Sequence, residues 1–202
     1  MPRKVGIASI ATFMLSVSPV AVHQAKAVES TRYMEVRGTT TAPMGFVQFC
    51  RENPADCQPR SSNAVMALSK ARWDELVRVN EQVNNSIEPV TDQDNFGVVE
   101  WWTYPENKRG DCEDYVLLKR KVLMDRGWPD SALLITVVRD EKGDGHAVLT
   151  ARTDKGDMIL DNQNPTVLPW SRTAYTFVKR QSASNSARWE SVAARPVETA
   201  LR

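Results

Sequence analysis

The 202-residue sequence predicts an α+β fold in which N-terminal helices pack on a mostly antiparallel sheet. Apolar residues recur at helical spacing up to about residue 126. From residue 132 onward the pattern changes to short apolar runs rich in β-branched residues, separated by turn signals. The chain carries no internal repeat or low-complexity tract. We therefore expect a single domain covering residues 28–202.

Two helices are expected in the first half, after an extended polar arm at residues 28–42. The first is short and covers residues 44–52. The second is longer and is capped by Ser62 or Asn63, because either side chain can accept a hydrogen bond from the free N–H groups of a first turn. Its apolar stripe consists of Val65, Leu68, Leu76, Val79 and Val83.

A third helix begins at Cys112, in the segment GDCED that starts at Gly110. It stops at Gly127, since glycine is typical of helix C-termini, and Pro129 follows. Its apolar face carries Tyr115, Leu118 and Val122 at helical spacing.

The second half of the chain is expected to form the sheet. Residues 132–138 are a continuous apolar run, as in a buried strand. Residues 146–151 and 157–161 form a hairpin, because the turn sequence Thr-Asp-Lys-Gly lies between them. Residues 174–179 alternate aromatic and polar side chains and form a further strand. The polar segment after residue 181 is assigned no structure.

The register of the hairpin decides which side chains meet. A two-residue turn pairs Thr153 with Gly156 and Val148 with Asp161, which places Asp161 on the same sheet face as His146 and diagonally across from it. A three-residue turn with a bulge at Gly156 would reverse that parity. An ordinary strand-ending turn is the alternative explanation for Asp161.

The first 27 residues have the pattern of a secretory signal peptide. Arg3 and Lys4 form a positive region, residues 5–17 are mostly apolar, and the small-x-small sequence at 25–27 fits a cleavage site. A membrane anchor is disfavoured, because the apolar run is shorter than the ~20 residues of a spanning helix and Pro19 interrupts it. We expect export with cleavage.

The charge balance gives no support for nucleic-acid binding. The whole chain has 26 basic and 25 acidic residues, and removal of Arg3, Lys4 and Lys26 leaves 23 against 25, a net charge of −2. Basic blocks that could bind phosphate backbones are also missing from the sequence.

Three cysteines in an exported chain leave one over. Cys50 and Cys57 flank a turn-forming Asn-Pro-Ala-Asp stretch, so we expect them to form a disulfide that closes a short loop. Cys112 is then the free thiol. A disulfide from Cys112 to Cys50 or Cys57 is the alternative, and it would abolish any catalytic role of Cys112.

Cys112, His146 and Asp161 have the residue types of a thiol nucleophile, its base and the group that orients the base. A cysteine at a helix start sees the positive end of the helix dipole and free backbone N–H groups, which favour the thiolate. His146 is the single histidine beyond the signal segment. The alternative is that Cys112 is a buried, inert cysteine.

Two acidic residues, Asp111 and Glu113, flank the thiol, and their charge opposes thiolate formation. An oxygen-seeking cation such as calcium would neutralise them. Each could instead serve only as a cap for the first helical turn. The residues therefore predict a cation site at Asp111 and Glu113, completed by oxygen atoms from the preceding loop, but they do not choose the ion.

Three segments together resemble a known family. GDCEDY from Gly110 with a following Lys119, then GHAVL from Gly145, then LDN from Leu160, look like the bacterial transglutaminase-like cysteine proteinases. The resemblance implies a papain-like or transglutaminase-like core and a Cys112–His146–Asp161 triad. It also implies calcium at Asp111 and Glu113.

The LapG-type members of that family are periplasmic and cut the N-terminal region of large biofilm adhesins. The resemblance thus implies a periplasmic location, a protein substrate such as a large adhesin, and control by an inner-membrane receptor for cyclic di-GMP. Two other functions stay open from the residues alone. One is a transglutaminase-like acyltransferase, which shares the fold and triad, and the other is a non-catalytic calcium-dependent binding module.

Overall fold

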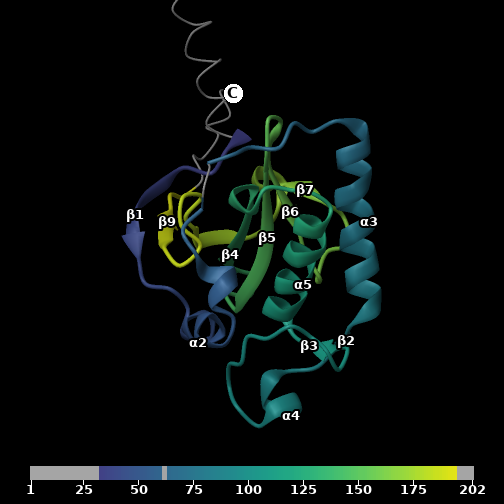
Figure 1. The fold of residues 1–202 in the computed structure, drawn as a ribbon, viewed down its shortest axis with the longest axis vertical. Helices are drawn as coiled ribbons and strands as arrows, with labels where there is room; N and C mark the ends of the chain where they lie inside the picture. The colour runs from purple at the N-terminus through teal and green to yellow at the C-terminus, as the bar shows by residue number, and fades with distance from the viewer. Residues whose placement is uncertain (1–31, 61–62, 195–202) are drawn as a thin grey trace, which may run out of the picture.

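A computed structural model describes residues 32–60 and 63–194 of the chain. The expected signal segment, residues 1–27, lies outside these ranges. In the described part, helices pack on one face of an antiparallel sheet, which confirms the α+β class (Figure 1). No helix in this part is long and apolar enough to cross a membrane.

The helical elements comprise four α-helices and three 3-10 helices within the described ranges. They are α2 (Met44–Glu52), η1 (Pro54–Cys57), α3 (Lys70–Ser86), α4 (Asp92–Phe96), α5 (Cys112–Asp125), η2 (Asp130–Ala132) and η3 (Trp170–Arg172). The strands are β1 (Val36–Thr40), β2 (Glu88–Pro89), β3 (Arg109–Gly110), β4 (Leu133–Arg139), β5 (Gly145–Thr153), β6 (Gly156–Leu160), β7 (Leu168–Pro169), β8 (Thr176–Gln181) and β9 (Trp189–Val192).

The main sheet has the order β1-β9-β8-β4-β5-β6-β7, and each neighbouring pair is antiparallel. β2 and β3 form a separate short parallel pair, just before α5. Figure 1 shows α5 between β5 and α3, so that the helix beginning at Cys112 lies against the strand that carries His146.

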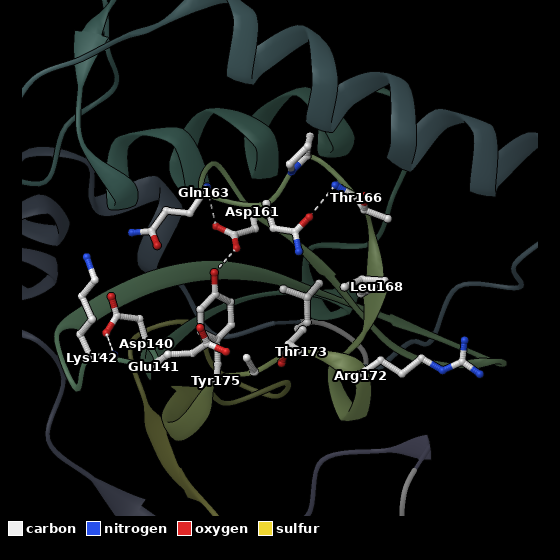
Figure 2. Close-up of a pocket in the computed structure, with 14 residues that line it drawn as sticks. Asp140, Glu141, Lys142, Asp161, Gln163, Thr166, Leu168, Arg172, Thr173 and Tyr175 are labelled. Carbon is white, nitrogen blue, oxygen red and sulfur yellow. Dashed lines mark hydrogen bonds between the residues drawn. The ribbon is translucent and has the colours of Figure 1, made fainter.

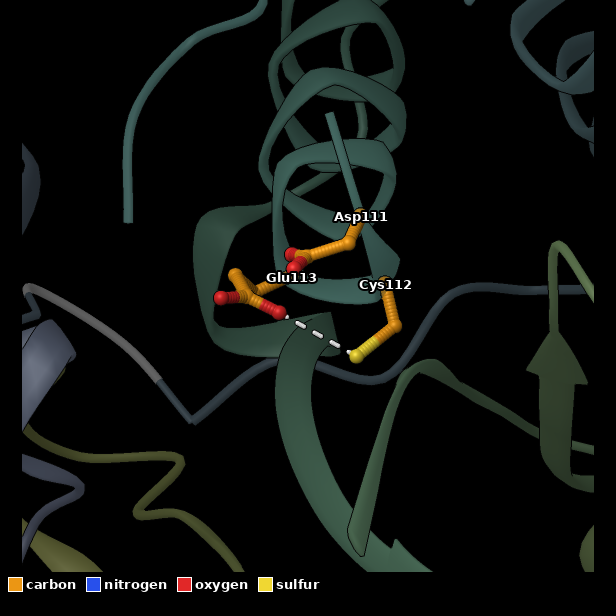
Figure 3. Close-up of side chains that lie close together, drawn as sticks. All are labelled: Asp111, Cys112 and Glu113. Carbon is orange, nitrogen blue, oxygen red and sulfur yellow. Dashed lines mark hydrogen bonds between the residues drawn. The ribbon is translucent and has the colours of Figure 1, made fainter. Parts of the chain in front are cut away.

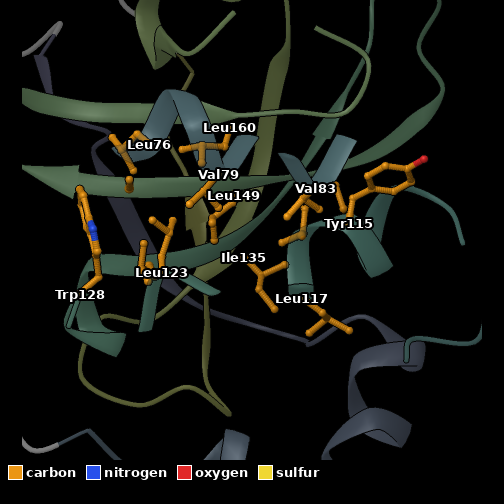
Figure 4. Packing of buried hydrophobic residues seen from close by; sticks show 14 of the residues in the cluster. Leu76, Val79, Val83, Tyr115, Leu117, Leu123, Trp128, Ile135, Leu149 and Leu160 are labelled. Atoms are coloured by element: carbon orange, nitrogen blue, oxygen red, sulfur yellow. The ribbon is translucent and has the colours of Figure 1, made fainter. Parts of the chain in front are cut away.

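The larger core lies between the helices and the sheet. It brings together apolar residues from α3 and α5 with those of β4, β5 and β6 (Figure 4). The labelled members of this cluster are Leu76, Val79, Val83, Tyr115, Leu117, Leu123, Trp128, Ile135, Leu149 and Leu160. A smaller cluster covers the opposite face of the sheet and includes Val138, Val148, Ile159, Trp170 and Phe177. With both faces covered, the central strands read as continuous apolar runs rather than as alternating ones.

The helix at residues 44–52 and the helix beginning at Cys112 are confirmed. The expected start of the longer helix at Ser62 or Asn63 is wrong. The helix begins at Lys70, and the Ser69 side chain accepts the capping hydrogen bond from the Arg72 N–H. Residues 63–69 precede it because Met66 exchanges backbone hydrogen bonds with the turn between β5 and β6, which holds this segment outside the helix.

The hairpin has the register that places His146 and Asp161 together. Thr153 pairs with Gly156 and Leu149 with Leu160, so the turn contains two residues. Gly156 adopts φ +121°, a value that a side chain would disfavour. The disulfide between Cys50 and Cys57 is also present, and Cys112 is free.

The two strands at one edge of the sheet, β1 and β9, were not expected. β1 falls within the predicted extended arm, and β9 falls within the polar segment that received no assignment. Trp189 of β9 is buried against Phe46 and Trp102, which shows that long-range packing stabilises this strand more than its own sequence does.

Candidate active site

Cys112 is the first residue of α5, and Asp111 occupies the N-cap position with extended backbone angles. The thiol is partly buried and lies 3.1 Å from the Oε2 atom of Glu113. Figure 3 shows the two side chains directed toward each other. Burial and the negative charge of Glu113 raise the pKa of Cys112, whereas a contact with the backbone of Ala147 lowers it.

His146 and Asp161 meet at the end of the β5–β6 hairpin. The His146 Nε2 atom lies 2.8 Å from the Asp161 Oδ1 atom, and both side chains are buried. Burial opposes ionisation of Asp161, but the hydrogen bonds from His146 and Tyr175 outweigh it and hold the pKa of Asp161 below its usual value. The pair is therefore arranged so that a charged carboxylate orients the imidazole ring.

Of the three predicted residues, His146 and Asp161 are hydrogen-bonded to each other, and Cys112 lies next to them in the structure. Cys112 contacts the backbone of Ala147, the residue that follows His146. Among the described residues, the hydrogen bond of the thiol is made to Glu113 and not to His146. The other ring nitrogen of His146, Nδ1, lies 3.3 Å from the Nε2 atom of Gln163.

Tyr175 is a member of this site that the sequence did not predict. Its hydroxyl donates a hydrogen bond to Asp161 Oδ2, and its ring lies 5.5 Å from the imidazole ring of His146. Burial and the adjacent Asp161 raise the pKa of Tyr175, so the phenol remains a hydrogen-bond donor. The aromatic–polar alternation of residues 174–179 predicted a strand, but no local pattern could show that Tyr175 contacts Asp161.

A cavity of about 530 Å³ opens beside this group. Asp161, Gln163 and Tyr175 form one wall, where Figure 2 shows the Tyr175 hydroxyl and the Gln163 backbone N–H directed toward the Asp161 carboxylate. The loop after β4 and the segment from Leu168 to Tyr175 supply other parts of the lining. The cavity therefore gives a ligand access to the neighbourhood of Asp161.

A cluster of four carboxylates surrounds the start of α5. The sequence predicted Asp111 and Glu113, and the structure places them in contact. Asp92 of α4 and Asp114 of α5 complete the cluster, since their carboxylate oxygens lie within 4.8 Å of that of Asp111. Asp92 was not predicted because it is 19 residues from Asp111 along the chain and only α4 brings it close.

The oxygen atoms of this cluster are only half satisfied. Backbone N–H groups donate to one oxygen each of Asp92, Asp111 and Asp114, from Trp101, Asp92 and Thr103 respectively. The second oxygen of each carboxylate, namely Asp92 Oδ1, Asp111 Oδ1 and Asp114 Oδ2, is buried and has no hydrogen-bond partner. Buried oxygens without donors are costly unless a cation or a proton meets them.

The electrostatics of the cluster agree with this geometry. Burial raises the pKa of Asp92 to about 6, of Asp114 to about 7 and of Glu113 to about 10, and the neighbouring carboxylates add to each shift. Gly110 permits the arrangement, because a Cβ atom at that position would overlap the Asp114 carboxylate. The donor set of carboxylate oxygens therefore fits a hard cation such as Ca²⁺.

The sequence model of the family described as "Bacterial transglutaminase-like cysteine proteinase BTLCP" matches residues 36–196. The chain belongs to this family. No curated protein matches the chain.

Among solved structures, this member of the proteinase family is similar to LapG from Legionella pneumophila. Calcium-bound LapG is 26% identical, with a TM-score of 0.49 over 55% of this chain and 65% of that chain. EGTA-treated LapG is 27% identical, with a TM-score of 0.47 over 54% of this chain and 62% of that chain. The chain thus spans just under two thirds of the length of each of these structures.

Proposed function

We propose that this protein is a periplasmic, calcium-dependent cysteine endopeptidase that uses Cys112, His146 and Asp161. The observation that carries the proposal is the buried His146–Asp161 hydrogen bond beside the free cysteine at the start of α5. Because Asp161 holds Nε2, the ring nitrogen left to serve the thiol is Nδ1. A thiol–imidazole–carboxylate set needs one ring nitrogen for the carboxylate and the other for the thiol.

In the proposed reaction, His146 accepts the thiol proton as the Cys112 sulfur attacks a peptide carbonyl carbon. Free backbone N–H groups in the first turn of α5 can stabilise the oxyanion. The C–N bond then breaks, the leaving amine takes the proton from His146, and an acyl-enzyme thioester remains. A water molecule, deprotonated by His146, hydrolyses the thioester and regenerates the thiol.

The proposed cation site consists of Asp92, Asp111, Glu113 and Asp114. Each of the three aspartates has one buried oxygen without a hydrogen-bond donor. A bound calcium ion would supply positive charge that compensates these carboxylates. Glu113 has a second role in this scheme, since the same carboxylate that would hold the ion accepts the hydrogen bond of the Cys112 thiol. If Glu113 binds the cation, it no longer accepts the hydrogen bond of the thiol, and the thiol can turn toward His146.

The substrate and the cellular setting are proposed from the family resemblance. We expect residues 1–27 to be removed on export and residues 28–202 to act as one domain in the periplasm. The substrate is then a cell-surface or secreted protein such as a large adhesin. A receptor for cyclic di-GMP in the inner membrane is the expected regulator.

The test is cleavage of the N-terminal segment of a large secreted adhesin from the same organism. We expect the wild-type protein to cut it in calcium, and C112S and E113Q to fail. E106Q, which removes an exposed carboxylate from the loop before α5, is the matched control and should cleave normally. Cleavage by C112S at the wild-type rate would overturn the proposal, as would wild-type protein that leaves the segment intact in calcium.

A further inference from the structure

We infer that Asn80 and Asn84 of α3 are positioning residues, which hold Asp161 and the turn after it in place against His146. The inference rests on the proposed roles of His146 and Asp161 and adds to them a structural element remote in sequence. α3 is separated from Asp161 by more than 75 residues, and its amide side chains reach the backbone of Asp161 directly.

The backbone of Asp161 needs partners because it lies beyond the paired part of β6. The last pair of the β5–β6 ladder is Leu149 with Leu160. Asn80 Oδ1 accepts a hydrogen bond from the Asp161 N–H at 3.1 Å, and Asn84 Nδ2 donates one to the Asp161 carbonyl at 2.8 Å. Two side chains thus replace the ladder bonds that the strand no longer supplies.

The placement of these two asparagines on α3 supports a specific role. They are four residues apart, so they lie on the same side of the helix. Asparagine is a poor residue for a helix interior, because its side chain competes for backbone hydrogen bonds. Asn80 is nevertheless 0% exposed, beside the apolar residue Val79 in the core. An apolar residue would pack at Asn80 without the cost of burying an amide.

Asn80 also contacts both ends of the turn at residues 161–165. Its Nδ2 atom donates a hydrogen bond to the Pro165 carbonyl at 3.0 Å, so one amide bridges Asp161 and Pro165 at the two ends of the turn. Gln163 lies in the middle of it. The Gln163 N–H donates to Asp161 Oδ1 at 3.0 Å, and its side-chain Nε2 lies 3.3 Å from His146 Nδ1. We call the hydrogen bonds of Asn80 and Asn84 to Asp161 and Pro165 the clamp. The positions of Asp161 and Gln163, which lie next to the two ring nitrogens of His146, therefore depend on it.

The first part of the test uses N84D and N80D, which keep the shape of the side chain and remove the donated hydrogen bonds. N85A is the matched control, since Asn85 is the exposed neighbour on α3. We expect both aspartate variants to lower kcat about tenfold or more with KM within twofold, because misplacement of reacting groups affects turnover rather than substrate binding. N85A should match the wild type. Should an aspartate variant fail to fold, N84A provides the same comparison.

The second part is an NMR measurement that does not require activity. A full-length chain with H23Q and no histidine tag retains His146 as its single histidine. Ring ¹⁵N shifts report the tautomer, and exchange of the Nε2 proton reports how firmly Asp161 holds it. We expect a single Nε2-protonated form with slow exchange in this background and in N85A, and a mixed tautomer or at least tenfold faster exchange in N84D and N80D.

The two readouts separate failure of the inference from failure of the proposed function. Wild-type spectra in folded N84D and N80D would overturn the clamp, even if the wild-type protein were an active peptidase. Conversely, a wild-type protein that does not cleave its substrate would refute the peptidase proposal, while altered spectra in the variants would still support the clamp.

Discussion

The Nε2 atom of His146 is 2.8 Å from the Oδ1 atom of Asp161, and the Tyr175 hydroxyl holds the other carboxylate oxygen of that aspartate. Both oxygens of Asp161 are therefore engaged, and the imidazole ring is fixed with Nδ1 facing away from Asp161, 3.3 Å from Gln163 Nε2. The relationship explains how one hairpin can supply both the base and the group that orients it.

D161N should keep the fold and lose turnover. An amide in this position can offer an N–H group to Nε2, which favours the wrong tautomer of His146, and a comparable change in a serine protease triad lowers kcat by about 10⁴-fold. We expect a loss of about 10²- to 10⁴-fold in kcat, measured on the adhesin segment. D144N, in the exposed loop before β5, is the control. D161N turnover within threefold of the wild type would remove Asp161 from the mechanism.

The hairpin was predictable because its determinants are local. The Thr-Asp-Lys-Gly sequence predicts the turn but allows two registers. The structure has the two-residue turn, which places His146 and Asp161 on the same face. The start of α5 was predictable for the same reason, since Asp111 and the apolar spacing after Cys112 are contiguous in sequence.

The features that could not be predicted from the sequence depend on contacts between distant segments of the chain. Asp92 reaches the carboxylate cluster only because α4 folds back on the start of α5, and Tyr175 reaches Asp161 from the segment just before β8. The late start of α3 has a similar cause, because Met66 bonds to a turn that lies almost 90 residues further along the chain. Local periodicity carries no information on such contacts.

Calcium should stabilise the folded chain through the carboxylate cluster. Ligand at 100 times its dissociation constant stabilises by about 2.7 kcal/mol, which corresponds to a rise in Tm of roughly 5–10 °C for a chain of this size. D92N and D111N should lose most of this rise, because each removes charge from buried oxygens that lack donors. E106Q should retain it.

Thermal unfolding in calcium, magnesium and EGTA measures the effect. Magnesium at the same concentration should give a smaller rise, since it is less tolerant of irregular carboxylate geometry. Identical melting temperatures in calcium and EGTA would show that the cluster binds no calcium under these conditions.

Lys119 should make stability depend on pH in the alkaline range. Its ammonium group is fully buried without a hydrogen-bond partner, 5.9 Å from the Tyr115 ring centre, and burial lowers the pKa of Lys119 to about 7, with Asp161 opposing the shift. Between pH 7 and the ordinary lysine value of about 10.4, the unfolded chain binds a proton that the folded chain does not. The cost of burying Lys119 is therefore full below about pH 7 and declines as the pH rises to 10.

K119M should consequently raise the free energy of unfolding, by on the order of 4 kcal/mol near pH 6 and by much less at pH 10. Urea unfolding at several pH values measures the difference, and K121M, at an exposed position on the same helix, is the control. A gain that is equal at pH 6 and pH 10 would contradict the assigned titration of Lys119.

The disulfide should matter for stability and for the environment of α5. Cys50 and Cys57 close a loop that contains Asp56, which lies 3.8 Å from the buried Arg120 of α5. Loss of so short a loop constraint costs about 2–3 kcal/mol by chain entropy. We expect the free energy of unfolding of the double variant C50S/C57S, measured by urea unfolding, to be lower by that amount. Intact mass after alkylation without reduction should show one modified thiol in the wild type, and any other number would refute the pairing.

The central claim is that Cys112 is a nucleophile activated by His146 and released from Glu113 when the carboxylate cluster holds a cation. The rate of iodoacetamide labelling of Cys112 against pH, in calcium and in EGTA, tests it most directly. In calcium the wild-type inflection should fall below the ordinary thiol value of ~8.5 and rise in H146A, whereas in EGTA it should lie above that value, as burial and Glu113 dictate. One inflection near 8.5 under all of these conditions, unchanged by H146A, would contradict the account.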